Sequence, residues 1–91
     1  MDLRKMNEQL GEAMRVATEL QRANPNDATL IVVAKQLAYL RETYDREGTF
    51  DSVPKDRLTF GVIAAKNEYD VNYPKFADLL HEISYTFRCR G

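Results

Sequence analysis

The sequence predicts an all-α protein, a compact antiparallel bundle of four helices that forms a single domain over residues 1–91. Three observations predict this fold. Apolar residues recur at spacings of three and four, which gathers them on one side of an α-helix. Only four glycines and three prolines occur in 91 residues. The prolines lie in short joints between the periodic segments, and short connections favour antiparallel neighbours.

The first predicted helix covers residues 3–23. Its apolar stripe consists of Leu3, Met6, Leu10, Ala13, Ala17 and Leu20. Gly11 costs this helix about 1 kcal/mol relative to alanine, and a close helix crossing would explain it. Asn24 should end the helix, because Pro25 disfavours the α conformation in the residue before it.

The second predicted helix covers residues 28–46. Asn26 or Asp27 can cap its free N–H groups, and Gly48 marks its end. The main apolar stripe consists of Leu30, Val33, Leu37, Leu40 and Tyr44. A second set lies away from the centre of that stripe on the helical wheel: Val32, Gln36, Tyr39 and Thr43. This helix therefore has apolar surface beyond one stripe.

The third and fourth predicted helices follow a loop at residues 48–53. The third runs from Pro54 to Tyr69, with Leu58, Val62, Ala65 and Tyr69 as its stripe. Phe60 and Ile63 point elsewhere, and Gly61 indicates either close helix packing or the approach of a partner's backbone. After a corner at residues 70–74, the fourth helix runs from Pro74 to Arg88. Its stripe consists of Phe76, Leu79, Leu80, Ile83 and Phe87.

Charge excludes two classes of partner. Thirteen Lys and Arg residues face fourteen Asp and Glu residues, for a net charge of −1. Nucleic-acid binding normally needs a positive excess, and so does docking on anionic lipid. The longest apolar run, residues 30–34, is far shorter than the ~20 residues of a membrane span. With no signal-peptide pattern at the start, we expect a cytoplasmic protein.

The chemistry-bearing residues are too few to predict an enzyme. One histidine, His81, and one cysteine, Cys89, exclude an internal disulfide and a Cys/His zinc site. The sequence has neither a glycine-rich phosphate loop nor a nucleophile elbow. Its neighbouring carboxylates lie outside apolar runs, so we expect them to be solvated. We therefore expect no enzymatic activity, no metal and no cofactor.

The surplus apolar residues of the second and third predicted helices allow two interpretations. Val32, Tyr39, Phe60 and Ile63 cannot all be covered by a single stripe contact. Either the second and third helices have neighbours on two sides, or these residues form a patch that meets a partner, where tyrosine is often a hot spot. The sequence alone leaves both interpretations open.

Two stretches of the chain resemble a known family. Residues 35–41, KQLAYLR, and residues 56–66, DRLTFGVIAAK, look like segments of small helical immunity proteins of bacterial type VI secretion systems. The best-known member neutralises a toxin that hydrolyses NAD and NADP. The likeness covers roughly residues 28–88. It implies a cytoplasmic protein that binds a cognate effector toxin domain and covers its substrate cleft.

The implied partner predicts a set of binding residues. A pocket that holds the pyrophosphate of NAD tends to be positive, so an inhibitor should offer carboxylates and an aromatic anchor. The candidates are Gln36, Tyr39, Glu42, Asp45, Glu47, Asp51, Phe60, Glu68 and Asp70. The alternative is a helical adaptor or homodimerisation module that uses the same face, with a homodimer expected when the toxin is absent. A DNA-binding regulator is disfavoured, because no helix is basic.

Overall fold

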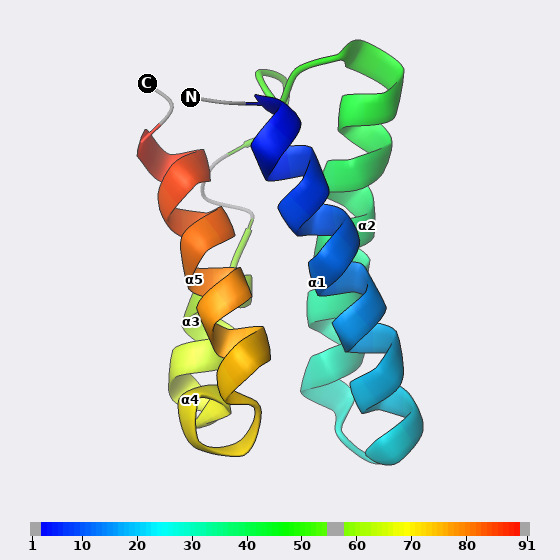
Figure 1. Cartoon of the computed structure of the whole chain (residues 1–91), viewed down its shortest axis with the longest axis vertical. Helices are drawn as coiled ribbons and strands as arrows, with labels where there is room; N and C mark the ends of the chain where they lie inside the picture. The colour runs from blue at the N-terminus through cyan, green and yellow to red at the C-terminus, as the bar shows by residue number, and fades with distance from the viewer. Residues whose placement is uncertain (1–2, 55–57, 90–91) are drawn as a thin grey trace.

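The computed structural model describes residues 3–54 and 58–89. They form five helices and no strand: α1 (Leu3–Ala23), α2 (Ala28–Glu47), α3 (Phe60–Lys66), α4 (Tyr69–Asn72) and α5 (Pro74–Cys89) (Figure 1). The prediction of an all-α protein is confirmed. The predicted ends of the first, second and fourth helices agree with α1, α2 and α5 to within one residue.

The helices pack around one core with extents of 33 × 21 × 21 Å. α1 packs against α2 on one side and α5 on the other, and α3 also lies between α2 and α5. α1 and α2 run antiparallel, and α1 begins at the end of the molecule where α5 finishes (Figure 1). The arrangement is bundle-like, but only three of its members are long.

The predicted third helix from Pro54 to Tyr69 is wrong. Pro54 is not helical, and α3 occupies only residues 60–66, with residues 55–57 outside the described part of the chain. Asn67 ends α3, since both its backbone N–H and its side-chain amide donate to the Ile63 carbonyl. Glu68 then adopts a left-handed conformation, φ 56°, which separates α3 from α4.

The shorter α3 buries a different face from the one predicted. Phe60 and Ala64, one turn apart, are the buried residues of this helix, while Val62 is 42% exposed. Phe60 therefore belongs to the core and not to a surplus surface. Thr43 is buried as well, and its hydroxyl donates to the Tyr39 carbonyl. Val32 and Tyr39 remain exposed, whereas Ile63 packs partly against the core.

The predicted loop at residues 48–53 is not helical, yet two of its residues belong to the core. Phe50 and Val53 are buried, and the Phe50 ring stacks on Tyr44 with the centroids 5.3 Å apart. The loop begins as predicted at Gly48, whose φ of 74° suits glycine and whose N–H donates to the Tyr44 carbonyl. Phe50 and Val53 therefore add residues from a non-helical segment to the core.

Asp27 joins the start of α2 to the segment that carries α4. Its carboxylate accepts hydrogen bonds from the backbone N–H and the hydroxyl of Thr29, and from the Tyr73 hydroxyl at 3.0 Å. Because the single hydroxyl proton of Thr29 goes to Asp27, the Tyr69 hydroxyl donates to Thr29, 2.6 Å away. These bonds, chiefly those from Thr29, lower the pKa of Asp27. The prediction of Asp27 as an N-cap is confirmed.

The matched changes Val53→Ala and Val71→Ala test whether the loop is part of the core. Val53 is 3% exposed and Val71 is 71% exposed. We expect Val53→Ala to lower the free energy of unfolding by about 2 kcal/mol, because it removes buried carbons and leaves a cavity. Val71→Ala should stay within about 0.5 kcal/mol of the parent protein. Equal urea midpoints for the two variants would contradict the role given to the loop.

The change Asp27→Asn tests the α2–α4 connection through pH. At neutral pH we expect a loss of about 1 kcal/mol, because the charged acceptor is replaced by a neutral one. The folded pKa of Asp27 lies below its unfolded value of about 3.9, so the stabilisation is complete above that pH and disappears as pH falls through the folded pKa. Urea unfolding from pH 7 down to pH 2 should therefore show the variant and parent converging at acid pH. The exposed Asp70→Asn change is the control, and a constant difference across that range would refute the connection.

Candidate functional site

Exposed apolar side chains gather on the outer side of α2. Of the six large apolar side chains most exposed in the described part of the chain, three lie on this helix: Ile31, Val32 and Tyr39, at 43%, 44% and 40%. The buried stripe of α2 faces the opposite way. We call the exposed residues Ile31, Val32, Lys35, Tyr39 and Glu42 the outer α2 face.

Gln36 lies beside this face but is bonded within the protein. Its side-chain amide donates to the Thr59 hydroxyl and accepts from the Thr59 backbone N–H, both at 2.9 Å. Thr59 is the N-cap residue of α3, so Gln36 fixes the start of that helix against α2. Gln36 therefore positions α3, and its amide is already satisfied.

The candidate carboxylates are all exposed but fall into two groups. Glu42, Asp45, Glu47 and Asp51 lie along the last turns of α2 and the loop after it. Glu68 and Asp70 lie around α4, at the other end of the molecule (Figure 1). Only the first group adjoins Tyr39, because Glu42 follows Tyr39 by about one turn of the same helix.

Within the first group, Glu47 is already paired. It accepts a hydrogen bond from Arg46 at 3.0 Å, and this bond, followed by one from Ser52, lowers the pKa of Glu47. Phe60, the other aromatic candidate, is 1% exposed and offers no surface to a partner. Tyr39, Glu42 and Asp45 are thus the candidates that the fold presents together.

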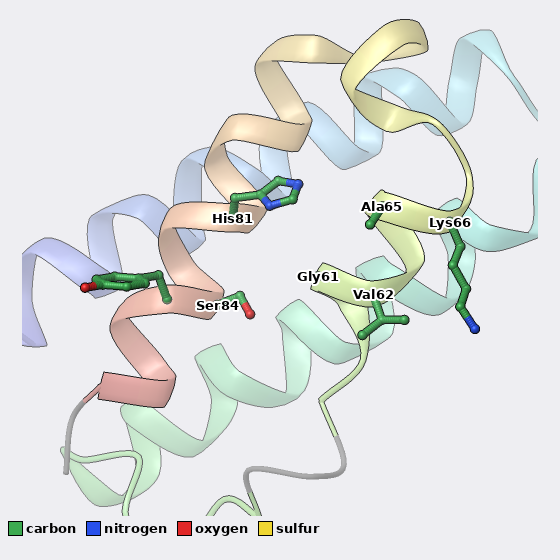
Figure 2. Close-up of a pocket in the computed structure, with 7 residues that line it drawn as sticks. Gly61, Val62, Ala65, Lys66, His81 and Ser84 are labelled. Atoms are coloured by element: carbon green, nitrogen blue, oxygen red, sulfur yellow. The ribbon is translucent and has the colours of Figure 1, made fainter.

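A second apolar surface is the groove between α3 and α5, with a volume of about 590 Å³. Its lining residues are Gly61, Val62, Ala65, Lys66, His81, Ser84 and Tyr85. His81 and Ser84 project from α5 toward α3, while Lys66 extends away from α5 (Figure 2). A Cβ on Gly61 would lie 3.0 Å from the Ser84 hydroxyl oxygen, so close packing of α3 on α5 accounts for this glycine.

Tyr85 is an exposed aromatic residue that the sequence analysis did not select. It is 72% exposed, and it borders both the α3–α5 groove and a second pocket between α1 and α5. The signal was present in the sequence, since Tyr85 falls outside the apolar stripe of its helix. An aromatic residue off the stripe is a candidate contact residue for the same reason as Tyr39.

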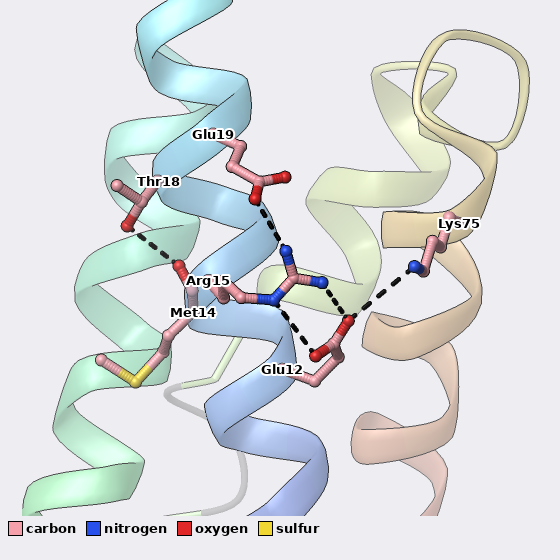
Figure 3. Close-up of polar contacts among 6 residues, drawn as sticks. All are labelled: Glu12, Met14, Arg15, Thr18, Glu19 and Lys75. Carbon is pink, nitrogen blue, oxygen red and sulfur yellow. Dashed lines mark hydrogen bonds and ion pairs between the residues drawn. The ribbon is translucent and has the colours of Figure 1, made fainter.

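The most extensive charged network ties α1 to α5. Arg15 bonds Glu12 on one side and Glu19 at 2.7 Å on the other, and Lys75 of α5 lies 3.8 Å from Glu12 (Figure 3). The hydrogen bond from Arg15 lowers the pKa of Glu12, and the same bond raises the pKa of Arg15. All four side chains are substantially exposed, so this network contributes little stability.

The described residues offer no metal-binding set. No three His, Cys, Asp or Glu side chains among residues 3–54 and 58–89 lie close enough to hold a metal ion. None of the helices in this part of the chain is long and apolar enough to cross a membrane.

Comparison with known proteins identifies a family. The Tsi6 family model matches residues 5–89, nearly the whole chain, and so includes α1, which lies outside the resemblance over residues 28–88. No curated protein and no solved structure matches the chain. The chain therefore belongs to the Tsi6 family, a family of type VI secretion immunity proteins.

Proposed function

We propose that this protein binds a cognate secreted toxin domain through the outer α2 face and blocks the toxin's active site. The observation that carries the proposal is the exposure of Ile31, Val32 and Tyr39 on the same side of one helix of an immunity-family protein. Apolar side chains gathered within three turns and bordered by charges are typical of interaction sites. The proposed target is a toxin that hydrolyses NAD or NADP.

Tyr39 is the proposed anchor of the contact. The residue is 40% exposed, so part of its surface is covered by the fold while the rest is open to a partner. A tyrosine in this position adds contact area with little loss of side-chain freedom, which is why tyrosine is enriched at binding hot spots. Val32, two turns before Tyr39, extends the apolar surface along the helix.

Charge supports the choice of target. Glu42, about one turn after Tyr39, and Asp45 are exposed on the last turns of α2, and a site that binds a dinucleotide pyrophosphate tends to be positive. Opposite charges would speed the encounter and suppress wrong partners, whereas the apolar contacts would slow dissociation. Glu68 and Asp70 lie at the far end of the molecule, so the proposed contact does not include them.

Inhibition is proposed to be steric and to need no chemistry from this protein. A toxin cleft covered by a bound helix cannot admit its substrate. Protection of a cell requires tight binding, and a nanomolar dissociation constant corresponds to about 12 kcal/mol. An apolar face with one aromatic anchor and flanking charges is the kind of surface that supplies such affinity.

Co-expression with a cognate NAD-consuming toxin domain tests the function. We expect cells that carry both proteins to grow and to keep their NAD and NADP, while cells with the toxin alone lose both. Measured NAD loss despite a stable complex would refute active-site blocking. Light scattering that finds a tight homodimer and no toxin complex would favour the adaptor alternative.

The matched changes Tyr39→Ala and Tyr85→Ala test the location of the contact. Each removes an exposed tyrosine, one from the outer α2 face and one from α5. We expect Tyr39→Ala to weaken toxin binding by about 2 kcal/mol, roughly thirtyfold in Kd, and Tyr85→Ala to leave Kd unchanged. Calorimetric titration gives the Kd values, and thermal melts confirm folding. The reverse result would move the site to the α3–α5 groove.

A further inference from the structure

Arg41 carries a positive charge with no partner in the described part of the chain. It lies on the side of α2 that faces α1 and is half-buried. Its Nε atom is sealed from solvent and has no hydrogen-bond partner. No described carboxylate lies within 4.0 Å of its guanidinium. Buried polar groups are nearly always hydrogen-bonded, so an exception at a charged group calls for an explanation.

Gly11 makes room for this guanidinium on α1. A Cβ at Gly11 would lie 2.9 Å from the Arg41 Nη1 atom, a separation that Cβ atoms essentially never show. The atom nearest to this glycine is therefore the end of the Arg41 side chain and not the backbone of a second helix. Because that side chain is flexible, a side chain at position 11 would shift the guanidinium and not the helices.

Asn7 of α1 is the second residue with a buried polar atom that lacks a hydrogen-bond partner. It lies one turn before Gly11 on α1, and its Oδ1 atom is also buried without a hydrogen-bond partner. The acidic residues nearby on α1 are engaged elsewhere, with Glu8 near Arg4 at 4.0 Å and Glu12 bonded to Arg15. Two buried polar atoms of α1 and α2, Asn7 Oδ1 and Arg41 Nε, therefore have no hydrogen-bond partner in the described part of the chain.

The position of Arg41 connects it to the proposed binding surface. At 100° per residue, Tyr39, Glu42, Asp45 and Arg41 follow one another around α2 through an arc of roughly 160°. A partner that covers the last turns of this helix would reach all four residues. Part of the desolvation and the loss of side-chain freedom of Arg41 has already occurred in the free protein, which favours binding of a negative group.

We propose that Arg41 is a receptor for an aspartate or glutamate side chain of the toxin, which its terminal nitrogens bind as a pair. This inference rests on the proposed function and adds a contact to it. The toxin would bring positive charge to Glu42 and Asp45 and a carboxylate to Arg41. Two contacts of opposite sign, on either flank of the same helix, would fix the orientation of the complex.

The change Asn7→Asp is the most direct test, because it places a carboxylate on α1 with almost no change of shape. We expect the new carboxylate to pair with Arg41, so that the urea midpoint of the free protein rises while binding of the purified toxin domain weakens about tenfold. Opposite effects on stability and on binding do not follow from a merely structural role for Arg41. An unchanged Kd together with a raised urea midpoint would overturn the proposal.

Arg41→Met and Gly11→Ala approach the same site from each side. Arg41→Met keeps the apolar stem and removes the charge, and Gly11→Ala displaces the guanidinium while favouring the helix. We expect both variants to melt at or above the parent temperature and to bind the toxin domain at least tenfold more weakly, with a smaller salt dependence for Arg41→Met. The exposed Arg22→Met change, which removes a guanidinium from the last turn of α1 at the opposite end of the molecule from the last turns of α2 (Figure 1), is the control and should bind normally.

Failure of this inference is distinct from failure of the proposed function. If the parent protein does not bind the toxin domain, the proposed function is wrong. If the parent binds and Tyr39→Ala weakens the complex while Arg41→Met and Gly11→Ala bind like the parent, only the Arg41 receptor is wrong. Should Arg41→Met fail to fold, the Gly11→Ala and Asn7→Asp measurements decide the question.

Discussion

Burial of one side of α2 is the constraint on which the rest of the structure depends. Leu30, Val33, Leu37 and Leu40 are completely buried, and α2 packs against both α1 and α3. α3 is only seven residues, about 10 Å long, so it covers a limited length of a helix of about 30 Å. Phe50 and Val53 complete the core from a non-helical segment. Tyr39 lies about one turn beyond Gln36, where α3 begins, and this explains why it stays open.

The long helices were predictable because their periodicity extends over many residues. α1, α2 and α5 each repeat an apolar stripe through about three turns or more, and Asp27 and Gly48 mark the limits of α2 by local chemistry alone. The third helix was not predictable for the opposite reason. The left-handed turn at Glu68 and the burial of Phe50, which stacks on Tyr44, lie outside the periodic segments, so the spacing of apolar residues does not reveal them.

The candidate binding residues also fall into two groups, those that the sequence could identify and those whose role only the fold shows. Val32 and Tyr39 could be found in the sequence because they lie off the stripe of a well-defined helix, and the structure leaves them exposed. Gln36 has the same position on the wheel, but its bonds to Thr59, 23 residues away, are a tertiary property. Phe60 was misplaced because the start of its helix was misplaced. For Gly11 the sequence indicated a close contact, and only the fold identifies Arg41 as the neighbour.

The features assigned to binding are also those that contribute least to the free fold. Ile31, Val32 and Tyr39 leave apolar area in water, and Arg41 leaves a desolvated nitrogen unpaired. A chain of 91 residues has a stability of only about 5–10 kcal/mol, so the stability lost at these residues is a sizeable fraction of the total. The buried loop residues Phe50 and Val53 offset this loss, because they add core without covering the outer side of α2. Covering that side with a longer third helix would stabilise the monomer and remove the surface on which the proposed contact depends.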